Sequence, residues 1–168
     1  NTHISKINKI ALFIKKAGAD FQFISASENN AWLLNIRGSD ADYAPIPNSY
    51  LLIDQYKNIK FFCDLKKISL SLKKNLKNVE FININLAEKI LSKINNKKFV
   101  IDKNSCSLFF ENIIKKNNII LDIQDPIYHF KSIKSKIEIK NIEKAHIQDG
   151  VALTKFLFWL KKNFYKKN

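Results

Sequence analysis

The chain has 168 residues, of which 46% are hydrophobic, and carries a net charge of +14. This length is enough for one sizeable core and is short for two full domains of typical size. No stretch approaches the roughly eighteen consecutive apolar residues that a membrane span needs, and no signal-peptide pattern opens the sequence. We therefore expect a soluble, cytoplasmic protein with one domain and an appendage.

The start of the sequence predicts that the chain is a piece of a longer protein. It contains no Met, and Asn1 is an unusual residue to be exposed by removal of an initiator Met. A fragment is the simpler interpretation.

The excess of positive charge would ordinarily indicate a nucleic-acid or membrane partner, because clustered cations neutralise phosphates. Here Arg37 is the only arginine among 29 basic residues. Arginine supplies the two-pronged contacts to phosphate and guanine that lysine cannot make. The matching excess of Asn and Ile fits a codon bias, so we favour a solvated surface over a specific nucleic-acid patch.

The first part of the sequence predicts a helix, a strand and a second helix before a long loop. Apolar residues recur at helical spacing over 4–16, and Gly18 is placed to follow the helix end in a left-handed conformation. An alternating strand over 21–25 precedes a short helix that Ser27 can cap. The segment 37–47 holds a glycine and two prolines, so we expect an irregular loop of the kind that often serves function.

The rest of the sequence alternates strand and helix patterns. The expected strands cover 49–53, 58–63, 79–83, 99–102 and 119–123, and the expected helices cover 65–76, 86–94 and 105–116. This alternation indicates an α/β fold, and the polar turn 54–57 predicts a β-hairpin that makes the sheet mixed. Asp125 and Pro126 are placed to start a short helix. A longer helical pattern over 137–162 begins a new unit, because nothing follows to complete its packing.

The residues that could carry chemistry are few. Cys63 and Cys106 lie in apolar surroundings without the spacing of a zinc site, so we expect buried, reduced thiols. His146 and Asp149 are one helical turn apart, which favours a local hydrogen bond over a metal site. No phosphate-binding loop, nucleophile elbow or metal motif occurs. A Lys-rich nucleic-acid-binding module and a small α/β enzyme of unknown substrate stay open as alternatives.

Two motifs carry a resemblance to a known family. The segment 32–40 reads WLLNIRGSD and is followed by Tyr43, Pro45 and a Ser49-Tyr50 pair. The segment 142–153 reads IEKAHIQDGVAL and is followed by a Trp-Leu pair at 159–160. Both resemble signatures of the three-domain Xaa-Pro aminopeptidases (aminopeptidase P) of the creatinase/prolidase family, in the order and at about the separation that the family has.

The resemblance implies a fold and a division of the chain. Residues 1–136 are expected to form the non-catalytic middle domain, an α/β fold of the creatinase N-terminal, ribonuclease H-like kind with a mixed sheet flanked by helices. Residues 137–168 are expected to hold the linker and the first helix of a "pita-bread" catalytic domain that starts around Glu138. Expected partners are the remaining domains of the parent, its peptide substrate and a second copy, with no specific nucleic acid and no membrane.

The resemblance also implies the chemistry of the parent. Its family releases the N-terminal residue from peptides with proline second, using two divalent ions, usually manganese, held by two Asp, one His and two Glu. None of those motifs occurs here, so we expect no catalytic residue, metal or peptidase activity in this chain.

The resemblance assigns roles to motif residues as well. Asn35, Arg37 and Asp40 become candidates for the substrate cleft, and Trp32, Gly38, His146 and Asp149 become structural motif residues. In the purely structural interpretation of the loop, Arg37 caps an element end, Gly38 takes a positive φ and Asp40 starts a turn.

Overall fold

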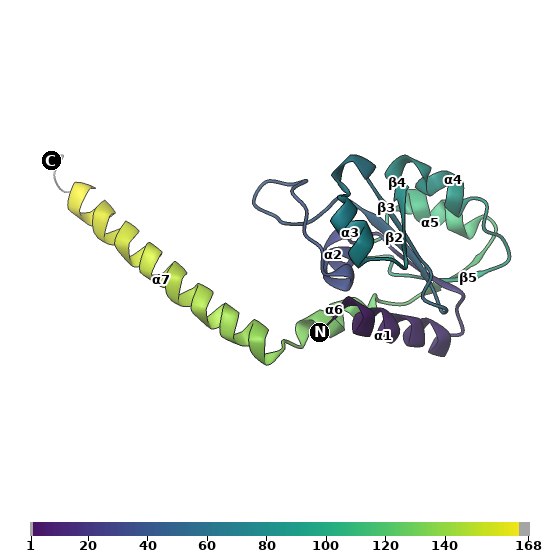
Figure 1. Cartoon of the computed structure of the whole chain (residues 1–168), viewed down its shortest axis with the longest axis horizontal. Coiled ribbons are helices and arrows are strands. Elements are labelled where there is room, and N and C mark those ends of the chain that lie inside the picture. The colour runs from purple at the N-terminus through teal and green to yellow at the C-terminus, as the bar shows by residue number, and fades with distance from the viewer. Residues whose placement is uncertain (1, 165–168) are drawn as a thin grey trace. The chain divides into compact units, whose positions relative to one another are not determined.

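A computed structural model of the chain describes residues 2–164 (Figure 1). Its contacts divide the chain into two compact units, 1–131 and 132–168, and each unit is described by itself. No described helix is long and apolar enough to cross a membrane.

The first unit is built on a six-stranded mixed sheet in the order β4-β3-β2-β1-β5-β6. Strands β1, β5 and β6 are parallel to one another, β3 is parallel to β4, and β2 is antiparallel to both of its neighbours. The strands are β1 (Phe21–Ile24), β2 (Tyr50–Asp54), β3 (Ile59–Cys63), β4 (Val79–Asn83), β5 (Lys98–Ile101) and β6 (Ile119–Asp122). The predicted hairpin is confirmed as β2 and β3, and five of the six strands therefore start at the same end of the sheet.

Helices cover both faces of this sheet (Figure 1). They are α1 (His3–Lys16), α2 (Ser27–Leu34), the 3-10 turn η1 (Leu65–Lys67), α3 (Leu70–Asn75), η2 (Ile84–Leu86), α4 (Ala87–Leu91), α5 (Leu108–Lys115) and α6 (Pro126–Ser132). One core joins α1, α2 and α6 to one face of the sheet, and the other joins α4 and α5 to the opposite face. Successive residues of β2 enter opposite cores, since Leu51 and Ile53 face α1 while Leu52 faces α5. The expected α/β fold is confirmed.

Local signals at several helix ends are confirmed. Gly18 follows the end of α1 with a φ of +64°, as its position predicts. Asp125 starts α6 and accepts a hydrogen bond from the backbone N–H of Ile127 at 3.0 Å.

Two other local predictions are wrong. Ser27 does not cap α2, because its hydroxyl donates to the carbonyl oxygen of Ser49 at 3.1 Å and Ala26 takes the cap position instead. The helix expected over 65–76 is divided into η1 and α3, because the hydroxyl of Ser69 accepts the N–H of Leu72 and starts a new helix there.

The second unit is dominated by α7 (Lys136–Phe164), a helix of 29 residues in which no residue is buried. Large apolar side chains are exposed along it, including Phe156, Leu157, Phe158, Trp159 and Leu160. Its first half alternates these with charged residues, whereas the segment 151–160 is apolar on most sides. A helix that is apolar all round is typical of a core, so this segment lacks the surroundings that its composition favours.

Candidate functional site

Asn35 ends α2 and is tied to α1 through Lys6. Asn35 adopts the left-handed conformation with a φ of 55°, which Asn tolerates better than most residues. Its side-chain oxygen accepts the ammonium of Lys6 at 2.5 Å, and the same ammonium donates to the carbonyl oxygen of Trp32 at 2.7 Å. The Lys6 nitrogen also lies 4.0 Å from the centroid of the Trp32 ring, a cation–π contact. Asn35 and Trp32 therefore hold α1 against α2.

Gly38 is required by close packing rather than by its backbone angles. A Cβ at this position would lie 2.6 Å from the Cα of Pro47, closer than real Cβ contacts. The positive φ expected at Gly38 is wrong, because the left-handed residues of this region are Asn35 and Tyr43. Gly38 thus lets the two ends of the loop meet, and its N–H donates to the carbonyl oxygen of Pro45 at 3.2 Å.

Asp40 joins the two sides of the same loop. Its carboxylate accepts the backbone N–H of Asn48 at 2.7 Å and forms a close ion pair with Lys67 of η1. The hydrogen bond from Lys67, followed by the one from Asn48, lowers the pKa of Asp40 below its ordinary value. Ionised Asp40 therefore connects the loop to the segment after β3.

The end of the loop is fixed by a buried polar cluster around Ser49. The backbone N–H of Ser49 donates to the hydroxyl of Ser27 at 3.2 Å, and the side-chain amide of Asn30 donates to the carbonyl oxygen of Ser49 at 3.1 Å. Tyr50 follows and packs its ring 4.7 Å from that of Phe110. The motif that the sequence singled out is thus largely a set of interlocking structural contacts.

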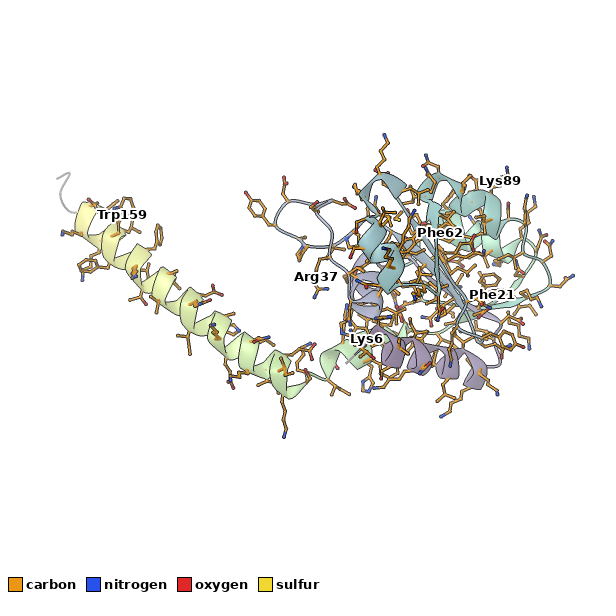
Figure 2. All side chains as sticks on the ribbon, viewed as in Figure 1. Lys6, Phe21, Arg37, Phe62, Lys89 and Trp159 are labelled. Carbon is orange, nitrogen blue, oxygen red and sulfur yellow. The ribbon has the colours of Figure 1, made fainter. Side chains whose placement is uncertain are left out.

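Arg37 is a motif residue whose side chain is exposed. Its guanidinium donates to the carbonyl oxygen of its own neighbour Ile36 at 2.8 Å, and no other partner is found for it within residues 2–164. Figure 2 shows the side chain extending from the loop. It borders a hollow of about 470 Å³ whose lining includes the apolar side chains of Pro47, Ile68 and Leu72. The Asp40–Lys67 ion pair also lines the hollow, and an exposed guanidinium at its border is suited to a ligand or surface that presents a carboxylate.

The sequence placed Asp125 at the start of a helix but did not predict that it belongs to a buried cluster of polar side chains. Asp125 accepts the side-chain amides of Gln22 at 3.0 Å and Asn29 at 2.7 Å, while its own N–H donates to Asp102 at 2.9 Å. Burial raises the pKa of Asp125 above its ordinary value, although hydrogen bonds oppose this. The signal available in the sequence was Gln22, a polar residue within an otherwise apolar strand.

The remaining candidates are placed as follows. His146 and Asp149 are exposed on α7, and the local hydrogen bond expected between them is not found among the described residues. Cys63 is buried as expected, whereas Cys106 is half-buried, and burial raises the pKa of each thiol to about 11. Within residues 2–164, no three His, Cys, Asp or Glu side chains form a group that could hold a metal ion.

Comparison with known proteins identifies the class to which this fold belongs. The sequence matches the family described as the creatinase/prolidase N-terminal domain over residues 1–138. The chain therefore belongs to this family.

Relatives and solved structures extend the similarity along the chain. The sequence is 33% identical over 168 residues to Xaa-Pro aminopeptidase 1 of Dictyostelium discoideum, covering 97% of this chain and 26% of that protein. It is 32% identical to Xaa-Pro aminopeptidase ApepP of Drosophila melanogaster, covering 91% of this chain and 26% of the relative. The chain thus spans about a quarter of the length of these curated relatives.

The crystal structure of X-prolyl aminopeptidase from Caenorhabditis elegans superposes with a TM-score of 0.87 at 23% identity, over 99% of this chain and 28% of that one. That protein is described as a cytosolic enzyme with a di-nuclear active site. The N-terminal domain of a metallopeptidase from Corynebacterium diphtheriae superposes with a TM-score of 0.55 at 14% identity, covering 73% of this chain and 97% of that one. These two structures support the fold.

Proposed function

We propose that this chain is a non-catalytic domain of a longer Xaa-Pro aminopeptidase, a metallopeptidase that releases the N-terminal residue from peptides with proline second. The observation that carries this proposal is the extent of the similarity. The family match ends at residue 138, whereas the similarity to the Dictyostelium aminopeptidase covers 97% of the chain and so continues into α7. Relatives that carry this sequence similarity over more than nine-tenths of the chain are described as Xaa-Pro aminopeptidases.

In this proposal, residues 1–136 form the domain and residues 137–168 supply the linker and first helix of the catalytic part. The exposed apolar side chains of α7 support the second assignment. Each large apolar side chain that becomes buried contributes about 1.5–3 kcal/mol, so the segment 151–160 gains most when protein surrounds it. In this proposal, the polypeptide that follows α7 in the longer protein covers these apolar side chains.

The metal ions of the reaction belong to that catalytic part. Two divalent ions, manganese by resemblance, would activate a water molecule for attack on the peptide bond. The side chains described here do not fit such a centre, because residues 2–164 contain no group of three metal-binding side chains. We therefore derive no step of the hydrolysis from this chain.

The role of the domain is to shape access to the catalytic cleft and to support assembly. Among the three cleft candidates, Asn35 and Asp40 have partners within the fold, so their contribution is to hold the loop in place. Arg37 is the candidate whose guanidinium is available for a peptide carboxylate or for the catalytic part. The proposed partners of the domain are the other domains of the parent protein and the peptide substrate. The proposed compartment is the cytosol, in line with the description of the Caenorhabditis enzyme as cytosolic.

The experiment compares this chain with the longer protein encoded by the same gene, each supplied with manganese. An Xaa-Pro peptide and a matched Xaa-Ala peptide are incubated with each, and release of the first residue is followed by mass spectrometry. The longer protein is expected to cleave the Xaa-Pro peptide selectively, and this chain is expected to be inert. Cleavage of either peptide by this chain, or loss of selectivity in the longer protein, would contradict the proposal.

A further inference from the structure

One edge of the sheet gathers most of the lysines of the first unit. Five turns lie at the end where β1, β3, β4, β5 and β6 start, and we call them together the lysine edge: 15–20, 54–58, 73–78, 93–98 and 115–118. The edge carries two aspartates, Asp20 and Asp54, against eleven lysines: Lys15, Lys16, Lys57, Lys73, Lys74, Lys77, Lys93, Lys97, Lys98, Lys115 and Lys116. The strand order places these turns side by side, along about 24 Å at a strand spacing of about 4.8 Å.

The opposite edge of the same sheet has the reverse balance of charge. The segments that follow the parallel strands, the loop before β2 and the last residue of β6 carry eight acidic residues: Glu28, Asp40, Asp42, Asp64, Glu88, Asp102, Asp122 and Asp125. They carry five basic residues: Arg37, Lys66, Lys67, Lys89 and Lys103. A codon bias toward lysine raises the number of lysines everywhere on a surface and gives no reason for acids and lysines to separate. The separation is therefore a property of the fold that the composition did not reveal.

Ion pairs between lysines and acidic residues also differ between the two edges. At the opposite edge Lys67 pairs with Asp40, and Lys103 lies 3.2 Å from Glu111. At the lysine edge the described ion pair is Lys97 with Asp20, at 3.8 Å.

The other aspartate of the lysine edge is occupied within its own turn. Asp54 accepts the backbone N–H groups of Tyr56 and Asn58 and the side-chain amide of Asn58. Within residues 2–164, ten of the eleven lysines thus have no acidic partner within 4 Å. Their mutual repulsion favours binding of a polyanion along the edge.

The shape of the edge favours a single nucleic-acid strand over a flat membrane. Two hollows, of about 390 and 860 Å³, lie along it; Lys74 and Lys77 line the first, and Lys97 and Lys116 line the second. A chain of phosphates can follow such hollows, whereas a bilayer surface contacts only what protrudes. Tyr56, at the tip of the β2–β3 hairpin in the middle of the edge, is 76% exposed and offers a ring on which a base can stack.

We propose that the lysine edge binds a single nucleic-acid strand without sequence preference, with lysines on the phosphates and Tyr56 under a base. The lack of arginine at this edge accounts for the missing sequence preference, because lysine contacts phosphate as a point charge. This binding is separate from the proposed peptidase role and uses the end of the sheet opposite to the Arg37 loop.

Fluorescence anisotropy of a short, labelled, mixed-sequence single-stranded RNA with the 168-residue chain tests the proposal. Contact with about four phosphates predicts a slope of about −3 in a plot of log affinity against log salt, and so about a 50-fold loss between 50 and 200 mM salt. The edge variant replaces Lys97, Lys98, Lys115 and Lys116 with Gln. The control variant makes the same replacement at Lys140, Lys144, Lys155 and Lys161 of α7, which gives the same net charge.

The edge variant is expected to bind at least tenfold more weakly at low salt, and the control variant is expected to bind as the parent chain does. Replacement of Tyr56→Ser is expected to weaken binding about fivefold or more, because stacking on the ring is lost. Circular-dichroism melting confirms that all variants are folded. Equal losses of RNA affinity in the edge and control variants would show that net charge alone determines binding, and would overturn the proposal. No RNA binding, or edge-dependent binding only to phosphatidylserine vesicles, would overturn it as well.

Discussion

The side-chain amide of Asn29 donates a 2.7 Å hydrogen bond to the carboxylate of Asp125, which lies 96 positions later in the chain. The bond joins α2 to the start of α6 in the interior of the first unit. Gln22 of β1 adds a second amide donor to the same carboxylate at 3.0 Å. Since Asp125 is only 3% exposed, these donors replace the water that an ionised carboxylate would otherwise bind.

Replacement of Asp125→Asn is expected to lower the free energy of unfolding by about 1–3 kcal/mol at neutral pH. The new amide would direct a donor at Asn29 or Gln22, both of which already donate to this position. Urea unfolding of the 168-residue chain measures the change. The control Asp42→Asn alters an exposed loop residue and should stay within about 0.5 kcal/mol of the parent chain. Equal changes in the free energy of unfolding for the two replacements would show that the hydrogen bonds of Asp125 do not stabilise the fold.

The pH dependence of stability follows from the raised pKa of Asp125. A folded-state pKa above the unfolded value of about 3.9 means that the folded chain binds this proton more tightly. The stabilisation from Asp125 is therefore fully present below the unfolded pKa and is lost as pH rises through the folded pKa. The difference in unfolding free energy between the parent chain and Asp125→Asn should widen as pH falls from neutral toward 3.9. A difference that narrows over this range would show that the hydrogen bonds lower the pKa of Asp125 by more than burial raises it.

Replacement of Gly38→Ala is expected to destabilise the first unit by about 1–3 kcal/mol, because the new Cβ would meet the backbone of Pro47 at 2.6 Å. Gly150→Ala is the matched control, since no atom lies within 4 Å of a Cβ there and Ala favours the helix. Thermal melting of both variants distinguishes a steric cost from a general effect of adding a methyl group. A Gly38→Ala variant as stable as the parent would contradict the close packing of the loop.

Much of the first unit could be predicted from local hydrophobic patterns. The continuous apolar run in β2, which is buried on both faces, and the helical spacing in α1 are patterns that a sequence displays directly. The N-cap assigned to Ser27 was wrong because a residue far along the chain, Ser49, accepts its hydroxyl. Boundaries of this kind depend on tertiary partners and are not encoded within one element.

The candidate loop was located correctly, but the partners of its residues were not predicted. Lys6 lies 29 positions from Asn35, and Lys67 lies 27 positions from Asp40, so neither pairing appears in local spacing. The lysine edge could not be predicted from local spacing either, because the strand order brings its five turns together. The roles of Asn35, Arg37 and Asp40 toward a substrate stay predictions.

Removal of residues 137–168 is expected to leave the domain folded with nearly unchanged thermal stability, because α7 has no buried residue. The same truncation should reduce self-association, since the apolar side chains of 151–160 favour contact with a second copy when no other protein covers them. Sedimentation velocity over a range of concentrations measures association for both lengths. Unfolding of the shortened chain would show that α7 belongs to the domain core.

Replacement of Arg37→Gln in the longer protein is expected to raise KM for Xaa-Pro peptides several-fold while kcat stays within about twofold, as for loss of a binding contact. Stability should change by less than about 0.5 kcal/mol, because the guanidinium is exposed. Arg37→Lys keeps the charge without the two-pronged geometry and should recover part of the loss. Unchanged KM in both variants would remove Arg37 from the cleft.

The central claim, that this chain is one domain of a longer Xaa-Pro aminopeptidase, is tested most directly by sequencing the transcript downstream of the Asn168 codon. The account predicts that the reading frame continues into a catalytic domain with the two Asp, one His and two Glu ligands that the family resemblance implies. A stop codon directly after Asn168, or a continuation without those five ligands, would contradict it.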